Sequence, residues 1–401
     1  MSRIARVWHV GAWNRNIGDW ALALAMHRQL NEQASERGLH LCFSLVDSQR
    51  TRFHPALVDQ MNDEADLVLV GGGGLIFHRP EDQSVSGWSF NIAPADLQRL
   101  RPPVAVYGVG YNRFAYDDGG FPETTGPHLR QLQAKAALFS VRNQGTRVAL
   151  VEQFGLAAEK IDVIPDPAIR LYDRPIALPS RATRGPVIAV NWAGDRPHHR
   201  YPSAGDAEHF FHVMRRALRR CVDELGAQIM FLPHLNQVDT EGYDAFAAGF
   251  PEGSIFSTHR DLPFLYPPPG ELLAPHVPFF TNLYRQADLV LAMRFHSAVL
   301  AFGAGTPFLR LGSHPKLKFF VEETGVPDYA IGLEHRTADT EEAMVGRIAA
   351  CRADASYRPA LSRALAEQTG RLRRFNDRVL DLLGKPAKRR AVHGIHAAQS
   401  I

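Results

Sequence analysis

Arg294 and His296 are the two residues of this chain whose types and spacing most directly suggest chemistry. They flank Phe295, between an apolar run and a short helix predicted to begin at Ser297. In extended backbone, side chains two residues apart point the same way, so both groups are able to converge on one anion. Arginine offers a bidentate fork for phosphate or carboxylate, and histidine exchanges a proton near neutral pH. The alternative is a structural arginine–carboxylate pair beside a histidine with satisfied hydrogen bonds.

Three further residues are candidates for the same site. Arg142 ends the apolar run LFSV, and Lys316 follows an apolar run that ends at Leu311. Asp166 stands between two prolines, where it either orients a substrate hydroxyl or caps a turn. For Lys316 the alternative is a solvated lysine. Cations outnumber carboxylates in this set, which favours an anionic substrate over glycoside hydrolysis by paired acids.

The turn Asn16-Ile17-Gly18-Asp19 precedes a predicted helix and is a candidate for anion binding. Backbone N–H groups and the helix dipole favour an anion at a helix start. We therefore assign Asn16, Gly18 and Asp19 to substrate binding, and Ser297 for the same reason at the later helix. For Asp19 the alternative is a capping role.

Four consecutive glycines, Gly71 to Gly74, follow another apolar run. Backbone without side chains approaches a ligand closely and reaches positive φ. We expect Gly72, Gly73 and Gly74 to contact substrate. Tight packing of a strand against a helix is the alternative.

These residues must be positioned by short apolar runs that alternate with helical patterns. Such alternation predicts an α/β fold with two parallel, doubly wound sheets, and ligands bind beyond the carboxyl ends of such strands. The predicted strands are 4–10, 40–46, 65–70, 104–109, 138–141, 161–164, 186–192, 228–232, 288–292 and 307–311. The predicted helices are 20–36, 126–138, 144–154, 206–225, 297–303, 340–352 and 357–384.

The length of 401 residues predicts more than one domain. We expect a Rossmann-like domain over 1–175, a linker over 173–186, and a second Rossmann-like domain over 186–355. A helical segment over 356–386 and a disordered tail over 387–401 complete the chain. Seven prolines between 250 and 280 predict a long loop or lid.

Composition excludes several other classes. The net charge of +3, without a basic stripe or a recognised motif, does not indicate nucleic acid. Three widely spaced cysteines predict neither a zinc site nor disulfides, which fits a reducing compartment. Without a signal peptide or a membrane-spanning run of about 20 apolar residues, we expect a cytoplasmic protein. The basic run at 385–390 is either a solvated tail or a contact with a membrane surface.

At this point the residues resemble the polysaccharide pyruvyltransferase family. The resemblance runs from residue 16 to about residue 320, so it covers most of the chain. The motifs that carry it are NIGDWALA, DLVLVGGGGLI, YGVGY, SVRNQ, VIPDPAI and DLVLAMRFHSAVLAFGAGTPFLRL followed by HPK. The R-x-H segment is the most specific of these.

The resemblance implies a glycosyltransferase type B-like fold, with two Rossmann-like halves facing a cleft. It also implies transfer of a pyruvyl group from phosphoenolpyruvate to two hydroxyls of a sugar, forming a cyclic ketal. Arg294, His296, Lys316 and Arg142 match positions associated with donor binding and catalysis, and the glycine run matches a cleft-lining loop. No metal or further cofactor is implied, and the acceptor is a sugar or glycan that is lipid-linked, nucleotide-linked or polymeric.

In this scheme His296 is the general acid or base, and the cations neutralise the donor. Asp19 or Asp166 takes the proton of the acceptor. Two alternatives stay open: a nucleotide-sugar glycosyltransferase of the same architecture, and a carbohydrate- or anion-binding module without activity. The oligomeric state is not predicted.

Overall fold

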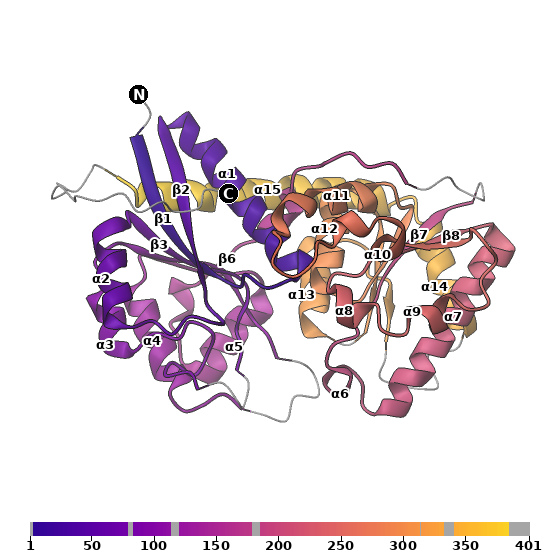
Figure 1. The fold of residues 1–401 in the computed structure, drawn as a ribbon, viewed down its shortest axis with the longest axis horizontal. Helices are drawn as coiled ribbons and strands as arrows, with labels where there is room; N and C mark the ends of the chain where they lie inside the picture. Colours follow the sequence, from indigo (N-terminus) through magenta and orange to yellow (C-terminus); the bar gives the residue numbers. More distant parts are fainter. Residues whose placement is uncertain are drawn as a thin grey trace.

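The computed structural model describes residues 3–78, 83–113, 120–178, 185–312, 314–332 and 341–384. It contains two six-stranded sheets, one in each half of the chain, and the two halves lie side by side (Figure 1). The strand orders are β2-β1-β3-β4-β5-β6 and β12-β11-β10-β7-β8-β9. All strand pairs are parallel. The predicted α/β class with two doubly wound sheets is therefore confirmed.

In the first half, helices connect each strand to the next. Its strands are β1 (Arg3–Gly11), β2 (Leu39–Asp47), β3 (Leu67–Ile76), β4 (Val104–Tyr111), β5 (Leu138–Val141) and β6 (Asp162–Val163). Its helices are α1 (Ile17–Glu36), α2 (Pro55–Glu64), α3 (Pro94–Arg99), α4 (Thr125–Lys135), α5 (Gln144–Phe154), and the 3-10 turns η1 (Ala158–Lys160) and η2 (Pro167–Arg170).

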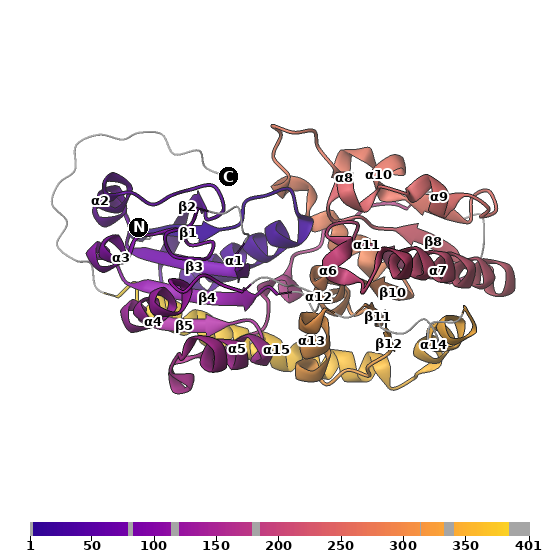
Figure 2. The same cartoon turned by 90° about the horizontal axis from the view of Figure 1, so that it is seen from below.

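The second half repeats the pattern (Figure 2). Its strands are β7 (Val187–Asn191), β8 (Gln228–Phe231), β9 (Ile255–Ser257), β10 (Leu289–Ala292), β11 (Phe308–Leu311) and β12 (Ala330–Ile331). Its helices are α6 (Pro197–Arg200), α7 (Ala204–Leu225), α8 (Asn236–Asp239), α9 (Tyr243–Ala247), α10 (Thr258–Asp261), α11 (Pro278–Arg285), α12 (Phe295–Ala304), α13 (Pro315–Thr324) and α14 (Glu341–Ala353), with 3-10 turns η3 (Pro263–Leu265) and η4 (Ala274–His276).

The central strands are apolar along almost their whole length because helices cover both faces of each sheet; the exception in β7 is the buried Asn191 at its end. The residues of β7 and β10 are all buried, as are those of β3 up to Gly73. Parallel strands need a crossover connection, which is why the apolar runs alternate with helices in the sequence.

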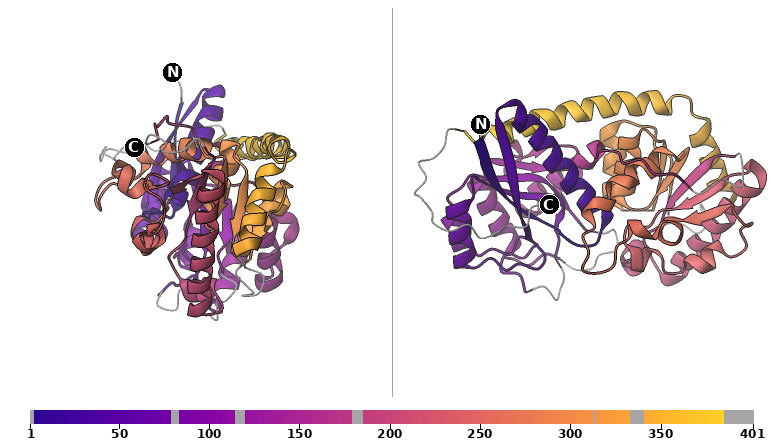
Figure 3. Two further views of the ribbon diagram at one scale, coloured as in Figure 1. Left: turned by 90° about the vertical axis from the view of Figure 1, so that its right-hand side faces the viewer. Right: turned by 45° about the horizontal axis from the view of Figure 1, so that its top comes forward.

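The long helix α15 (Tyr357–Asp381) runs from the second half back along the first (Figure 3). At its start, the hydroxyl of Tyr357 donates to the carbonyl of Phe308 at 2.7 Å. Near its end, Asn376 accepts from the hydroxyl of Tyr107 at 2.6 Å and donates to Gln33 at 2.9 Å. The sequence predicted this helix, but not that it joins both cores.

The proline-rich segment 250–280, for which the composition predicted a long loop or lid, is not one continuous loop. It is divided among short elements, from β9 to the start of α11, and Leu265 and Ala274 are buried in the core of the second half. Of the predicted linker, 173–178 and 185–186 are described, whereas the predicted tail and the basic run lie outside the described residues.

Candidate active site

His296 and Asp166 meet at the junction of the two halves. His296 lies in the first turn of α12, and Asp166 is the N-cap residue of η2. The histidine Nε2 lies 3.3 Å from a carboxylate oxygen of Asp166, and the two residues are 7% and 2% exposed. The other oxygen of Asp166 accepts from the N–H of Ala168 at 3.0 Å. Asp166 therefore caps a turn and orients the histidine at once.

The ring of His296 packs on Gly18, in the first turn of α1. A methyl group built on Gly18 would lie 2.2 Å from Nδ1 of His296, so a larger residue would displace the ring. The side chain of Asn16 caps α1 by accepting from the N–H of Gly18 at 2.9 Å. The N–H of Ile17 donates to the carbonyl of His234 across the junction at 3.2 Å. The expected anion-binding helix start is thus largely used by the protein: Asn16 caps the helix and Gly18 gives the histidine room.

Asp19 does not cap α1, since Asn16 does. One of its carboxylate oxygens accepts from the side-chain amide of Asn14 at 2.9 Å. The other lies 3.6 Å from the position of a methyl group built on Gly73. Asp19 also acts electrostatically on Arg142. Its carboxylate therefore borders the same region as the glycine run and the buried arginine.

Arg142 is a buried cation with an unused donor. It follows β5, is 4% exposed, and its guanidinium lies 4.4 Å from the centre of the Phe295 ring. Its Nε has no hydrogen-bond partner among the described residues. Burial lowers the pKa of this guanidinium, against the attraction of Asp166 and Asp19. A buried donor without a partner is costly in a folded protein, and an anionic ligand would satisfy it.

Lys316, near the start of α13, joins Arg142 from the other half. Its ammonium donates to the side-chain oxygen of Asn112 at 3.2 Å, across the junction. Burial lowers the pKa of Lys316 well below its usual range, and repulsion from Arg142 and Arg200 lowers it further. The cations at the junction are thus close enough to repel one another, and a bound anion would relieve that repulsion.

Arg294 is held by carboxylates of its own half. Its Nε donates to Asp239 at 2.7 Å, and its Nη2 donates to Asp195 at 2.7 Å and also to Asp239. These partners raise the pKa of Arg294 despite its burial. Nε and Nη2 of Arg294, which were expected to hold a substrate anion, are therefore bound to carboxylates of the protein. This is the alternative of a structural arginine–carboxylate pair that was left open by the sequence.

A profile of the polysaccharide pyruvyl transferase family matches residues 16–315. The chain belongs to this family. It is therefore a transferase of polysaccharide biosynthesis, and a polysaccharide acceptor follows from the family. A comparison with curated proteins finds no match.

Solved structures share the fold of this pyruvyl transferase. A putative UDP-N-acetylglucosamine 2-epimerase from Listeria monocytogenes is 14% identical, with a TM-score of 0.57 and 94% of each chain covered. UDP-GlcNAc 2-epimerase from Neisseria meningitidis, bound to UDP-GlcNAc, is 10% identical, with a TM-score of 0.53 over 94% of this chain and 100% of that one. A glycosyltransferase from Rickettsia africae is 9% identical, with a TM-score of 0.54 over 95% and 99%. The fold is therefore glycosyltransferase type B-like, as expected.

In the described part of this pyruvyl transferase, no helix has the length and apolar character needed to cross a bilayer.

The hydroxyl of Ser297 is bound within the second half of the chain. It accepts from that of Tyr284 at 2.9 Å, and Tyr284 in turn lies 2.8 Å from Nε2 of His234. Ser297 is fully buried. The N–H groups of this helix start were expected to bind an anion, and the N–H of Ser297 bonds the carbonyl of Arg294 at 3.0 Å. The hydroxyl of Ser297 holds α12 against α11.

The four glycines divide into two pairs within β3, rather than forming a loop after it. A methyl group on Gly71, where φ is 138°, would lie 2.1 Å from the carbonyl of Tyr107, and one on Gly72 would lie 2.2 Å from Leu22. These two serve strand–strand and strand–helix packing. Gly73 faces Asp19, and a methyl group on Gly74 would lie 3.0 Å from Asn112, the partner of Lys316. The second pair borders the site.

Asp239 is a site residue that the sequence did not reveal. It is fully buried and accepts from Arg294 and from three backbone N–H groups, those of Gly194, His234 and Leu235, at 2.9 to 3.2 Å. It thereby fixes the loops that follow β7 and β8. Its partners are 4 to 55 positions away and share no local motif, so no pattern in the sequence identified it.

His9 forms a hydrogen bond with the backbone of the glycine run. Its Nε2 bonds the carbonyl of Gly71, and its Nδ1 lies 2.7 Å from Nε2 of His27. Because a carbonyl only accepts, Nε2 of His9 carries the proton and His27 donates to Nδ1. Burial lowers the pKa of His9 to about 4, so the ring is neutral at pH 7.

The loop after β7 makes a second contact across the junction. Asp195 binds Arg200 at 2.9 Å as well as Arg294. The guanidinium of the next residue, Arg196, lies 4.6 Å from the ring centre of Phe77 in the first half. Arg196 has a φ of 56°, a conformation that costs about 1 kcal/mol or more in residues other than glycine and that clusters at functional sites.

Proposed function

We propose that this pyruvyl transferase takes its pyruvyl group from phosphoenolpyruvate and transfers it to two hydroxyls of a sugar in a glycan or glycan precursor, forming a cyclic ketal. The observation that carries the proposal is the buried guanidinium of Arg142, whose Nε has no partner among the described residues. It lies against Phe295, the neighbour of His296, and acts electrostatically on Lys316.

The donor requires such cations. Phosphoenolpyruvate carries a phosphate and a carboxylate, and Arg142 and Lys316 are two basic side chains from opposite halves at one junction, where a bound anion favours their charged forms. Charge-assisted hydrogen bonds to anions are strongest where water is excluded. Arg294 contributes charge and holds the loops after β7 and β8 through Asp239 and Asp195. No metal or other cofactor forms part of the proposal.

The His296–Asp166 pair supplies proton transfer. In its protonated form, His296 gives a proton to the methylene carbon of the donor, which becomes a methyl group. The cationic carbon that results is attacked by one sugar hydroxyl, whose proton passes to Asp19 and leaves with the phosphate. The second hydroxyl then closes the ketal and returns its proton to His296. Asp166 stabilises the imidazolium through Nε2, so Nδ1, on the side of Gly18, is the nitrogen that gives the proton. Asp19, with one oxygen toward Gly73, is the proposed acceptor of the hydroxyl proton.

The test is the release of phosphate from phosphoenolpyruvate in the presence of candidate glycans. We expect His296→Gln to lower turnover by about 10²- to 10⁴-fold, the usual contribution of general acid–base catalysis, with an unchanged melting temperature. Mass spectrometry of the glycan should show the added pyruvyl group. Near-normal turnover in this variant would overturn the assignment of His296.

The second candidate is a nucleotide-sugar glycosyltransferase. It is favoured by the fold shared with a glycosyltransferase and with an epimerase bound to UDP-GlcNAc. Stabilisation of the full chain by UDP but not by phosphoenolpyruvate, in a thermal-shift measurement, would favour this alternative. A binding module without activity would bind donor or glycan and release no phosphate with both present.

We place the reaction in the cytoplasm, with an acceptor that is presented either in solution or at the inner face of the membrane on a lipid. The absence of a membrane-spanning helix among the described residues is compatible with both. Sedimentation of the chain with and without anionic lipid vesicles distinguishes them.

A further inference from the structure

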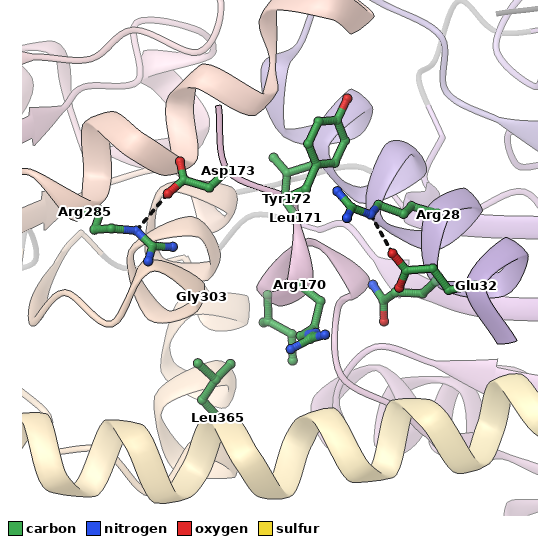
Figure 4. A pocket seen from close by; sticks show the side chains of 11 residues that line it. Arg28, Glu32, Arg170, Leu171, Tyr172, Asp173, Arg285, Gly303 and Leu365 are labelled. Atoms are coloured by element: carbon green, nitrogen blue, oxygen red, sulfur yellow. Dashed lines mark hydrogen bonds and ion pairs between the residues drawn. The ribbon is translucent and has the colours of Figure 1, made fainter. Parts of the chain in front are cut away.

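A hollow lies where the two halves of the chain join, and its walls come from both. It has a volume of about 370 Å³, within the usual range for small-molecule sites. We call it the junction groove. Its walls are α1, the segment 169–173, α11, the end of α12 and α15, as Figure 4 shows.

Three arginines line the junction groove. Arg28 and Arg170 belong to the first half, and Arg285 belongs to the second. Arg28 pairs with Glu32 at 2.7 Å, and Arg285 pairs with Asp173 at 3.0 Å. Arg170 forms no ion pair or side-chain hydrogen bond among the described residues, and Figure 4 shows it between the two pairs. With two carboxylates against three guanidinium groups, the groove carries a net positive charge.

The two ion pairs do not prevent the arginines from binding a ligand. The side chains of Arg28 and Arg285 are 49% and 53% exposed, and exposed pairs of this kind contribute about 1 kcal/mol or less. A ligand with two or more negative charges would therefore exchange or share these partners at low cost. Planar guanidinium groups match phosphate oxygens in particular.

The junction groove lies at the far ends of the two elements that carry the catalytic pair. The turn η2 begins after Asp166 and ends at Arg170, and α12 carries His296 in its first turn and Gly303 near its end. The two elements pack without a gap, since a methyl group on Gly303 would lie 2.5 Å from the carbonyl of Ile169. A change in their spacing at the groove would thus reach the catalytic pair.

We propose that the junction groove binds a small phosphorylated polyanion, which contacts arginines of both halves and fixes their spacing. This site is distinct from the donor site at Arg142 and does not depend on the proposed function. Its ligand acts by holding η2 and α11 together, and it takes no part in the chemistry.

The experiment measures the binding of inorganic pyrophosphate to the full chain by calorimetry, in an Arg142→Gln background that weakens anion binding at the catalytic site. We expect binding in this background, and a loss of affinity of about tenfold in each of Arg170→Gln and Arg285→Gln. The control is Arg101→Gln, because Arg101 forms a similar exposed pair with Asp63 at 2.9 Å elsewhere and should keep the affinity unchanged.

Two outcomes would overturn the proposal: no binding of pyrophosphate in the Arg142→Gln background, or equal affinity with and without the groove arginines. A loss in only one of the two groove variants would refute the bridge between the halves. Should Arg142→Gln fail to fold, the same groove variants are compared in a Lys316→Gln background, which also removes a basic group from the catalytic site. Because the readout is binding, failure of the proposed transferase reaction leaves this test intact.

Discussion

Two buried arginines stand in similar places in the two halves of the molecule, and they have opposite surroundings. Arg142 follows β5 and Arg294 follows β10, each beyond the carboxyl end of a parallel strand. The guanidinium of Arg294 is bound by Asp239 and Asp195, whereas Nε of Arg142 has no partner among the described residues. The position in the fold is therefore insufficient to assign a role, and the partners of each charge decide it.

This difference in partners indicates that Arg294 contributes to stability and Arg142 to ligand binding. A buried charge with its counter-charge holds loops in place, and removing one partner leaves the other charge uncompensated. A buried donor without a hydrogen-bond partner lowers stability, and a bound anion would satisfy it. We expect the second half to use Arg294 as scaffold and the first half to use Arg142 for the donor.

The largest expected effect is on folding, in Arg294→Met. Loss of the guanidinium leaves the carboxylate of Asp239 fully buried beside backbone N–H groups alone. The free energy of unfolding should fall by about 3–5 kcal/mol, measured by urea denaturation. Adding Asp239→Asn should restore part of the loss, because the amide keeps an acceptor oxygen without the charge. Stability unchanged in the single variant would contradict the scaffold role.

The next prediction concerns the pH dependence of stability and rests on the buried histidine His9. Its pKa lies at about 4 in the folded chain, against 6.5 for the free side chain. The unfolded chain therefore binds a proton on this ring below pH 6.5 that the folded chain does not take up until about pH 4. Between these values His9 should lower stability by about 1.4 kcal/mol for each pH unit of acidification.

The pH prediction is checked by urea denaturation between pH 4.5 and pH 7. In His9→Gln the unfolding free energy should fall less steeply as the pH is lowered, whereas the exposed His40→Gln should keep the original slope. Equal slopes in all three chains would show that the His9 ring is protonated in the folded state. Nδ1 of His9 would then donate to Nε2 of His27 instead of accepting from it.

The sequence was sufficient for the sheets and for much of the candidate site, for a physical reason. Fully buried parallel strands must be apolar throughout, so β7 and β10 stand out from composition alone. Residues after strand ends, such as Arg142 and His296, then fall near one junction. What failed was the assignment of partners: Asp239 binds Arg294 from 55 positions away, and nothing local marks it.

The same limit applies to the glycines and to α15. A glycine run at a strand end predicts either ligand contact or tight packing, and β3 uses Gly71 and Gly72 for packing and Gly73 at the site. The residue that meets each glycine belongs to another element, so the sequence alone could not divide them. Likewise, the period of α15 indicated a helix but not which core would receive it.

The smallest expected effect on stability is that of Arg142→Met, which tests the other arginine of the comparison. The flexible apolar side chain fills the space beside Phe295 and removes a buried donor without a partner. The lost attraction to Asp166 and Asp19 is offset by relief of a buried charge and an unsatisfied donor, so the free energy of unfolding should change by about 1 kcal/mol or less, or rise. Affinity for phosphoenolpyruvate, measured by calorimetry, should fall by about tenfold to a hundredfold, the contribution of one or two charge-assisted hydrogen bonds. A variant destabilised as strongly as Arg294→Met, with donor affinity intact, would place Arg142 in the scaffold as well and remove the asymmetry between the halves.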